Sequence, residues 1–194
     1  MSMPTIDEVF SRLAAGNQRY VNDQTEGNGR DASRRGELVG GQAPWAIVLS
    51  CADSRVAPEI LFDTGLGELF VIRVAGNVAN TSSTASIEYA VAHLGTPVIV
   101  VLGHQSCGAV GAALAGGDNG YNLNHLLAHI EPARAQLPDG PIADVVALNA
   151  RLNAEALVER SAIIRGAVES GKLRITPAVY SLDDGSVSFH DAIA

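Results

Sequence analysis

Apolar residues along this chain form short continuous runs, separated by stretches with helical spacing. The continuous runs predict buried strands over residues 45–50, 69–74, 98–102 and 173–182. Helical patterns lie between them, near 58–62 and from about 83 to 93, where Thr and Ser residues precede the second helix as caps. Strands that alternate with helices predict an α/β fold with a central, mostly parallel β-sheet flanked by helices.

Residues 1–44 follow a different pattern. Apolar positions with helical spacing come first, and a polar, glycine-containing arm follows from about 22 to 41. A second subunit would give such an arm a surface to lie on, but a mobile loop explains the pattern equally well. We expect a single domain over 1–194, with an N-terminal helix and arm in 1–44 that pack on a partner subunit. The helical positions are Ile6, Val9, Phe10, Leu13 and Ala14.

The C-terminal half is mainly helical up to about residue 170. Leu123, Leu126, Leu127 and Ile130 share helical spacing and predict one helix, and residues 145–168 predict a longer one. After the strand at 173–182, the dipeptide 184–185 is Asp-Gly, which predicts a hairpin turn into a last short strand at 187–189. The sheet is therefore expected to end in a C-terminal hairpin.

Composition narrows the classes of protein. The 194 residues are 47% hydrophobic, enough for one sizeable core. Thirteen basic residues stand against 21 acidic ones, for a net charge of −8, which disfavours nucleic acid as a partner. The N-terminus lacks the pattern of a secretion signal, and no apolar run approaches the length of a membrane span. We expect a cytoplasmic protein with no membrane partner.

The two cysteines of the chain lie next to other reactive side chains. Cys51 is followed by Asp53 and Arg55, and Cys107 is preceded by His104. Both segments follow predicted strands, whose ends meet at one edge of a parallel sheet. Two thiolates and an imidazole suit zinc, and three protein ligands leave a fourth position open, as in catalytic zinc sites. In a reducing compartment such cysteines are better explained as ligands than as a disulfide. The sequence predicts one Zn²⁺ per chain.

Two side chains near the predicted zinc leave alternatives open. Asp53 could bind the metal itself, or it could pair with Arg55 and become a fixed acceptor beside a zinc-bound water, which would then supply hydroxide near neutral pH. The Asp53–Arg55 pair could also do no more than hold a loop. Cys107 is expected to open a helix, whose N-terminal dipole would favour its thiolate form.

Four segments together resemble the β-class carbonic anhydrases. They are Cys-Ala-Asp-Ser-Arg-Val from residue 51, Gly-Glu-Leu-Phe-Val-Ile-Arg-Val-Ala-Gly-Asn over 67–77, Ile-Glu-Tyr-Ala over 87–90 and Val-Leu-Gly-His-Gln-Ser-Cys-Gly-Ala over 101–109. The resemblance covers roughly 45–115. It implies reversible hydration of CO2 to bicarbonate on zinc, in a homodimer or a dimer of dimers with active sites at the subunit interface. It also implies that Cys51, His104 and Cys107 are the zinc ligands and that Asp53 and Arg55 form a catalytic dyad.

The resemblance has departures. Members of the family can exist in a closed state in which the equivalent of Asp53 replaces the water on zinc. Some of those members carry a Trp three residues before the first cysteine as part of a regulatory bicarbonate pocket; this chain has Val48 there, so that pocket is expected to be absent. Val74 replaces a common Asn, and Thr64 or Gly65 stands where many relatives have a substrate-contacting Gln. These changes concern substrate affinity and rate more than the zinc site.

The remaining candidates are glycines and an asparagine near the predicted strand ends. Gly76 and Asn77 follow the strand at 69–74, and Gly108 follows Cys107, so all three are candidates to line the substrate pocket. The glycine-containing segment over 103–111 lacks the lysine of a phosphate-binding loop. Close packing of a helix on the sheet is a better explanation for its glycines, Gly103, Gly108 and Gly111. The other histidines are not spaced as metal ligands would be, and we assign them no role. They are His93, His125, His129 and His190.

Three other functions stay open at this point. A related enzyme could act on another small heterocumulene such as CS2 with the same metal. A non-catalytic zinc or bicarbonate-responsive module would keep Asp53 permanently on the metal, although the nearby Arg55 competes for it. A thiol redox protein would use Cys51 and Cys107 as a reversible pair, but it lacks Cys-x-x-Cys spacing and leaves His104 unexplained.

Overall fold

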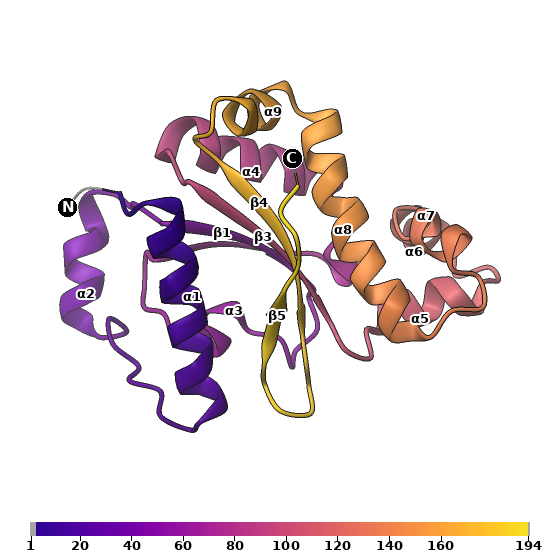
Figure 1. The fold of residues 1–194 in the computed structure, drawn as a ribbon, viewed down its shortest axis with the longest axis horizontal. Helices are drawn as coiled ribbons and strands as arrows, with labels where there is room; N and C mark the ends of the chain where they lie inside the picture. The colour runs from indigo at the N-terminus through magenta and orange to yellow at the C-terminus, as the bar shows by residue number, and fades with distance from the viewer. Residues whose placement is uncertain (1–2, 194) are drawn as a thin grey trace.

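The computed structural model describes residues 3–193 as a five-stranded sheet with helices on both faces (Figure 1). The strand order is β2-β1-β3-β4-β5; the first four strands are parallel, and β5 is antiparallel to β4. This confirms the α/β class, the mostly parallel sheet and the C-terminal hairpin. The strands are β1 (Ala46–Ser50), β2 (Leu69–Arg73), β3 (Val98–His104), β4 (Arg174–Tyr180) and β5 (Val187–Phe189).

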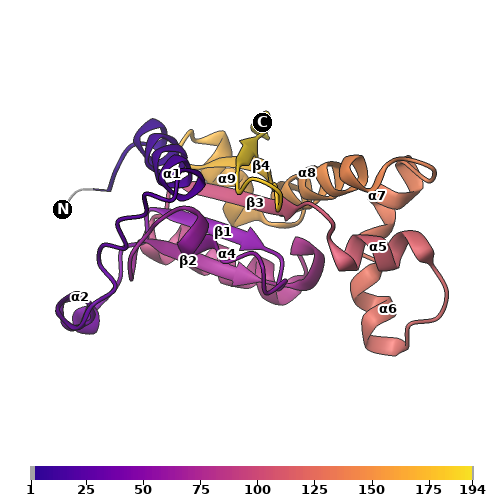
Figure 2. The ribbon, with the colours of Figure 1, turned by 90° about the horizontal axis from the view of Figure 1, so that it is seen from below.

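The helices cover the sheet and extend past one end of it. In Figure 2, α5, α6 and α7 lie together beyond the end of β3. No helix among residues 3–193 is both long and apolar enough to cross a membrane. The α-helices are α1 (Ile6–Val21), α2 (Ala32–Glu37), α3 (Pro58–Leu61), α4 (Thr81–Leu94), α5 (Gly108–Ala115), α6 (Tyr121–Leu127), α7 (Glu131–Gln136), α8 (Ile142–Arg160) and α9 (Ala162–Glu169); short 3-10 turns cover Leu38–Gly40 and Ala75–Asn77.

Strand side chains alternate between two cores. Val48 and Val100 pack with Leu13 of α1, whereas Ile47 and Ile99 belong to the core formed with α4, α8 and α9. All of these strand residues are fully buried, as expected for parallel strands covered on both faces. A third core joins the end of the sheet to α5, α7 and α8, and it contains both cysteines. The cysteines therefore lie where the sheet meets its helical extension.

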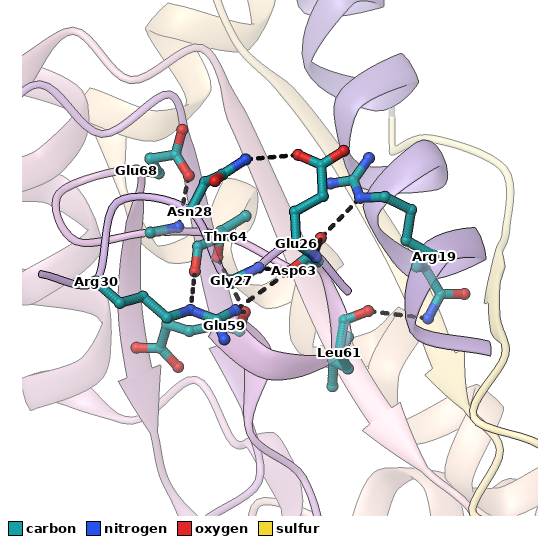
Figure 3. Close-up of polar contacts among 12 residues, drawn as sticks. Arg19, Glu26, Gly27, Asn28, Arg30, Glu59, Leu61, Asp63, Thr64 and Glu68 are labelled. Atoms are coloured by element: carbon teal, nitrogen blue, oxygen red, sulfur yellow. Dashed lines mark hydrogen bonds and ion pairs between the residues drawn. The ribbon is translucent and has the colours of Figure 1, made fainter. Parts of the chain in front are cut away.

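The arm after α1 is anchored by one buried carboxylate (Figure 3). Asp63, whose side chain is fully buried, accepts hydrogen bonds from the backbone N–H groups of Glu26 and Gly27, both at 3.0 Å. Arg19 of α1 donates to it at 2.7 Å, and Arg30 of the arm at 3.4 Å. The first half of the arm is thus fixed to its own chain, which argues against the mobile-loop interpretation for that half. In α2 no residue is buried.

Three details of the predicted helices are wrong. The N-cap of α4 is Asn80, whose Oδ1 accepts from the N–H of Ser83 at 2.9 Å, while the Thr and Ser residues lie inside the helix. The helix predicted over 145–168 is divided at Ser161, whose hydroxyl caps α9 by accepting from Ile164 at 3.1 Å. The helix predicted to include Ile130 ends at Leu127. In the second and third cases a side-chain cap or a turn interrupts a continuous apolar pattern.

Candidate active site

The carboxyl ends of β1, β2 and β3 meet at one edge of the sheet, and the predicted site lies there. In the ladder, Ser50 pairs with Arg73 on one side and with Leu102 on the other. Cys51 directly follows β1, and His104 is the last residue of β3. Cys107 is the N-cap of α5, reached through a turn in which Ser106 has a φ of 54°. Parallel strand ends position side chains from distant parts of the chain together.

Cys51, His104 and Cys107 form one compact cluster. Their potential ligand atoms all lie within 4.8 Å of one another, and all three residues are buried. The two sulfurs are 4.0 Å apart, and both cysteines are free. The predicted convergence of two sulfurs and an imidazole is therefore present in the fold.

His104 contributes its Nε2 to this cluster. Its Nδ1 lies 2.9 Å from the carbonyl oxygen of Gln105, which can only accept a hydrogen bond, so Nδ1 carries the proton and Nε2 carries a lone pair. Nε2 is buried and has no hydrogen-bond partner within residues 3–193. A buried nitrogen without a partner is costly, and a metal ion would satisfy it. Two sulfurs with this nitrogen match the donor set that zinc prefers.

The two cysteines differ in acidity. The Cys107 thiol, as hydrogen-bond donor, lowers the pKa of Cys51 to about 4, aided by the backbone N–H groups of Asp53 and Gly76 and opposed by burial. The same contact with Cys51, together with burial, raises the pKa of Cys107. The N–H groups of Val110 and Ala109 in α5 lower the pKa of Cys107, as the helix dipole predicts, but they are outweighed. The predicted contribution of the helix is therefore present, and the contact with Cys51 and burial outweigh it.

Asp53 is paired with Arg55 in this structure. Arg55 donates from Nε to Oδ1 at 2.9 Å and from Nη2 to Oδ2 at 2.8 Å, and its backbone N–H also donates to Oδ1 at 2.9 Å. These hydrogen bonds, the Arg55 side chain first, hold the pKa of Asp53 well below its usual range. Oδ2 lies 3.9 Å from Nε2 of His104. Of the two alternatives for Asp53, pairing with arginine is the one this structure shows.

Arg73 is a site residue that the sequence analysis did not single out. It ends β2 and donates from Nε to the carbonyl of Cys51 at 3.1 Å, and from Nη2 to the carbonyl of Asp53 at 2.6 Å. Both carbonyls belong to the loop after β1, so Arg73 fixes the backbone of that loop. The available signal was a charged residue at the end of an apolar strand on the same edge of the sheet.

The candidate pocket residues have different surroundings. The N–H of Gly76 donates to the Cys51 sulfur at 3.3 Å, so Gly76 borders the cluster directly. Asn77 is buried, and its Nδ2 has no partner in the part of the chain that the structure describes. A Cβ at Gly108 would meet no atom of residues 3–193 within 4 Å, whereas one at Gly103 would lie 3.2 Å from Val146 of α8. Close packing therefore explains Gly103 but not Gly108, which borders open space.

Comparisons with known proteins agree with this geometry. Residues 46–187 match a protein family described as carbonic anhydrase. The structure is similar to a tetrameric β-carbonic anhydrase from Sordaria macrospora, with a TM-score of 0.74 and 26% identity over 96% of this chain and 100% of that one. The chain belongs to the β-carbonic anhydrase family. The predicted resemblance is confirmed.

Two further relatives extend the similarity within the family. Carbonic anhydrase 2 of Mycobacterium tuberculosis is 38% identical over 200 aligned residues, which cover 98% of this chain and 97% of the relative. A Coccomyxa β-carbonic anhydrase, solved in complex with acetazolamide, has a TM-score of 0.71 and 28% identity over 96% of this chain and 84% of that one. Family membership assigns the chain to the carbonate dehydratases, a class of lyases. Enzymes of the β class use zinc, and the cluster described above can bind it.

Proposed function

We propose that this protein catalyses the reversible hydration of CO2 to bicarbonate and a proton at a zinc ion held by Cys51, His104 and Cys107. The observation that carries the proposal is the buried cluster, within 4.8 Å, of two sulfurs and the Nε2 of His104, which has no hydrogen-bond partner among residues 3–193. Cys51, His104 and Cys107 would hold the zinc and leave one position for water, which the metal would make acidic enough to supply hydroxide near neutral pH. One zinc ion per chain is expected.

The role of Asp53 follows from how its two oxygens are used. Oδ1 already accepts two hydrogen bonds from Arg55, while Oδ2 accepts one and lies 3.9 Å from Nε2 of His104. Oδ2 therefore keeps accepting capacity on the side of the cluster. An ionised carboxylate can only accept, so Asp53 would hold the proton of the attacking nucleophile and leave its lone pair for CO2. Arg55 would keep this acceptor fixed and charged.

Asp53 is also the proposed fourth metal ligand in a closed state. Three hydrogen bonds from Arg55 hold this carboxylate, and they would compete with the metal for it. The open arrangement is therefore favoured as long as Arg55 stays in place. Arg55 is about half exposed, with 53% of its side chain accessible, so it has room to move away.

The substrate pocket is proposed to be lined by Gly76, Asn77 and Gly108. Gly76 touches the Cys51 sulfur, and Gly108 borders open space next to Cys107. Neither glycine presents a side chain, which leaves room for a small linear molecule beside the metal. Asn77 adds an amide nitrogen without a partner in residues 3–193.

A homodimer, or a dimer of dimers, is the proposed assembly. The similar Sordaria macrospora enzyme is described as tetrameric. In this chain, α2 contributes no residue to the core, and Val39, just beyond α2, is 87% exposed. An arm with this exposed apolar residue fits a surface of a second copy. Sedimentation equilibrium should give at least twice the chain mass of 20.1 kDa; a monomer at all concentrations would contradict the proposal.

We propose the cytoplasm as the compartment, because both thiols are free.

Stopped-flow CO2 hydration by zinc-quantified protein tests the proposed activity. We expect hydration at about pH 7 and faster hydration well above it, lost after metal removal and inhibited by a sulfonamide. The metal-free protein is the matched control. Full zinc without hydration at either pH would contradict the proposal and would favour another substrate, such as CS2, or a non-catalytic zinc module.

A further inference from the structure

Two asparagines lie in the buried face of α8. Asn149 is 1% exposed and Asn153 is 5% exposed, and their spacing of four residues places them on one side of the helix. The neighbouring α8 residues Ala150, Ala154 and Leu157 belong to the apolar core. A primary amide is costly in such surroundings unless its hydrogen bonds are made. Their partners therefore indicate what these amides do.

Both amides are used to hold the segment after β2. Asn149 donates from Nδ2 to the carbonyl of Gly76 at 2.9 Å, and Asn153 accepts at Oδ1 from the N–H of Ala79 at 2.7 Å. Asn153 then donates from Nδ2 to Oδ1 of Asn149 at 3.0 Å. A carbonyl can only accept and an N–H can only donate, so these two backbone groups fix the orientation of both amides. The chain of hydrogen bonds runs in one consistent direction.

The segment that they hold has an unusual backbone. Gly76 has a φ of 71° and Asn77 a φ of 47°, two consecutive residues in the left-handed region. A Cβ on Gly76 would lie 2.7 Å from Cδ1 of Ile130, so the segment is also closely packed. Such conformations persist only where the surroundings impose them. The N–H of this same Gly76 donates to the sulfur of Cys51 at 3.3 Å.

We propose that Asn149 and Asn153 are positioning residues for the Cys51 thiolate. Asn149 holds the carbonyl of Gly76, and Asn153 holds both Asn149 and the end of the segment, so that the Gly76 N–H stays aimed at the sulfur. The hydrogen bond from this N–H fixes the position of the thiolate and draws electron density from the sulfur. It therefore controls how strongly the sulfur donates to the metal. The inference rests on the proposed function only in that Cys51 binds the metal.

Zinc release to a chromophoric chelator is the first test. Asn149→Leu removes the bond to Gly76 at similar side-chain size, and we expect zinc release about 10-fold faster or more, as for the loss of other groups that orient metal ligands. Leu157→Ala is the matched control, because it opens a cavity on the same helix without touching the hydrogen-bond chain. It should lower the unfolding midpoint and leave zinc release unchanged. Equal effects of the two variants would mean that Asn149 is only a structural residue.

The thiolate-to-metal charge-transfer band of the Co²⁺-substituted protein is the second test. Losing an N–H donor raises the energy of the sulfur lone pair, so the band should move to longer wavelength in Asn149→Leu and less in Asn153→Leu, with no shift in Leu157→Ala. An unchanged band and unchanged zinc release in Asn149→Leu would overturn the inference. If that variant does not fold, Asn149→Ser is read in the same two assays with the same expected directions. A wild-type protein without a thiolate band would instead contradict the proposed metal site itself.

Discussion

Arg55 binds both carboxylate oxygens of Asp53, at 2.9 Å to Oδ1 and 2.8 Å to Oδ2. The two residues are only two positions apart, and the backbone N–H of Arg55 adds a third hydrogen bond. Only 16% of the Asp53 side chain is accessible, whereas 53% of the Arg55 side chain is, so the carboxylate is the buried partner of the pair. The carboxylate is therefore held in one orientation beside the cluster.

Replacing the carboxylate of Asp53 should separate catalysis from metal binding. We predict that Asp53→Asn retains about one zinc per chain but hydrates CO2 about 100-fold more slowly, because the nucleophile loses its fixed acceptor. The measurement is stopped-flow hydration per bound zinc. Asp139→Asn, at an exposed position, is the control and should keep full activity. Full activity in Asp53→Asn would show that the carboxylate has no role in orienting the nucleophile.

Removing a ligand should abolish metal retention. We predict that Cys51→Ser and His104→Ala fall from about one zinc per chain to almost none after dialysis against a chelator, since a catalytic zinc site needs three protein ligands. His190→Ala, at an exposed histidine outside the cluster, should retain its zinc. The measurement is the zinc content per chain of each dialysed protein. Zinc retained by His104→Ala at the wild-type level would exclude His104 as a ligand.

Arg73 should matter for rate more than for metal binding. Arg73→Met removes the donors to the carbonyls of Cys51 and Asp53 while keeping an unbranched side chain. We predict about a 10-fold loss of hydration rate per bound zinc, since each lost hydrogen bond to a charged group is worth about 1.5–3 kcal/mol and the loop can partly relax. A wild-type rate in Arg73→Met would mean that the loop after β1 keeps its shape without the two hydrogen bonds from Arg73.

Asp63 should stabilise the fold without affecting the chemistry. Asp63→Asn leaves Arg19 and the arm without a buried counter-charge, and we predict a loss of about 3 kcal/mol in the free energy of unfolding at about pH 7. Urea unfolding measures it. Asp7→Asn is the control, because Asp7 pairs with Arg174 at the surface, with 88% of the Asp7 side chain exposed, and should cost less than about 1 kcal/mol.

The stabilisation by Asp63 should depend on pH. Burial tends to raise the pKa of Asp63, but hydrogen bonds from the N–H of Glu26 and from Arg19 outweigh burial and lower it. A carboxyl whose pKa is lower in the folded state stabilises the fold above its unfolded pKa of about 3.9, and this contribution is lost as the pH falls further. The difference between wild type and Asp63→Asn should therefore be constant near neutral pH and shrink below about pH 4. A difference that grows on acidification would reverse this assignment.

The sequence was sufficient to predict the site where reactive residues stand at the ends of predicted strands. Cys51 and His104 each stand at the end of a continuous apolar run, so a parallel sheet brings them together whatever the details of the loops. The strands β1 and β3 were predictable because every one of their residues is buried, which makes their apolar runs continuous. The division at Ser161 was not, because the apolar spacing continues across it and only a side-chain cap interrupts the helix.

Hydrogen bonds from side chains to backbone groups could not be predicted from the sequence patterns. Nothing in the order of residues shows that Arg73 binds the carbonyls of Cys51 and Asp53, because carbonyls carry no sequence signal. The pair Asn149 and Asn153 did leave a signal, two amides four residues apart among apolar positions, but its meaning depends on the course of the segment at 75–79. The acidity of Cys107 likewise depends on the nearby Cys51 sulfur more than on its own helix.

Zinc K-edge X-ray absorption on the purified wild-type protein tests the central claim most directly, because it counts the atoms bound to the metal. We predict one zinc per chain with two sulfur neighbours at about 2.3 Å and two nitrogen or oxygen neighbours at about 2.0–2.1 Å. The sulfur count should fall to one in any zinc that remains in Cys51→Ser. Protein without zinc, or zinc with four sulfur neighbours or with none, would contradict the site proposed for this chain.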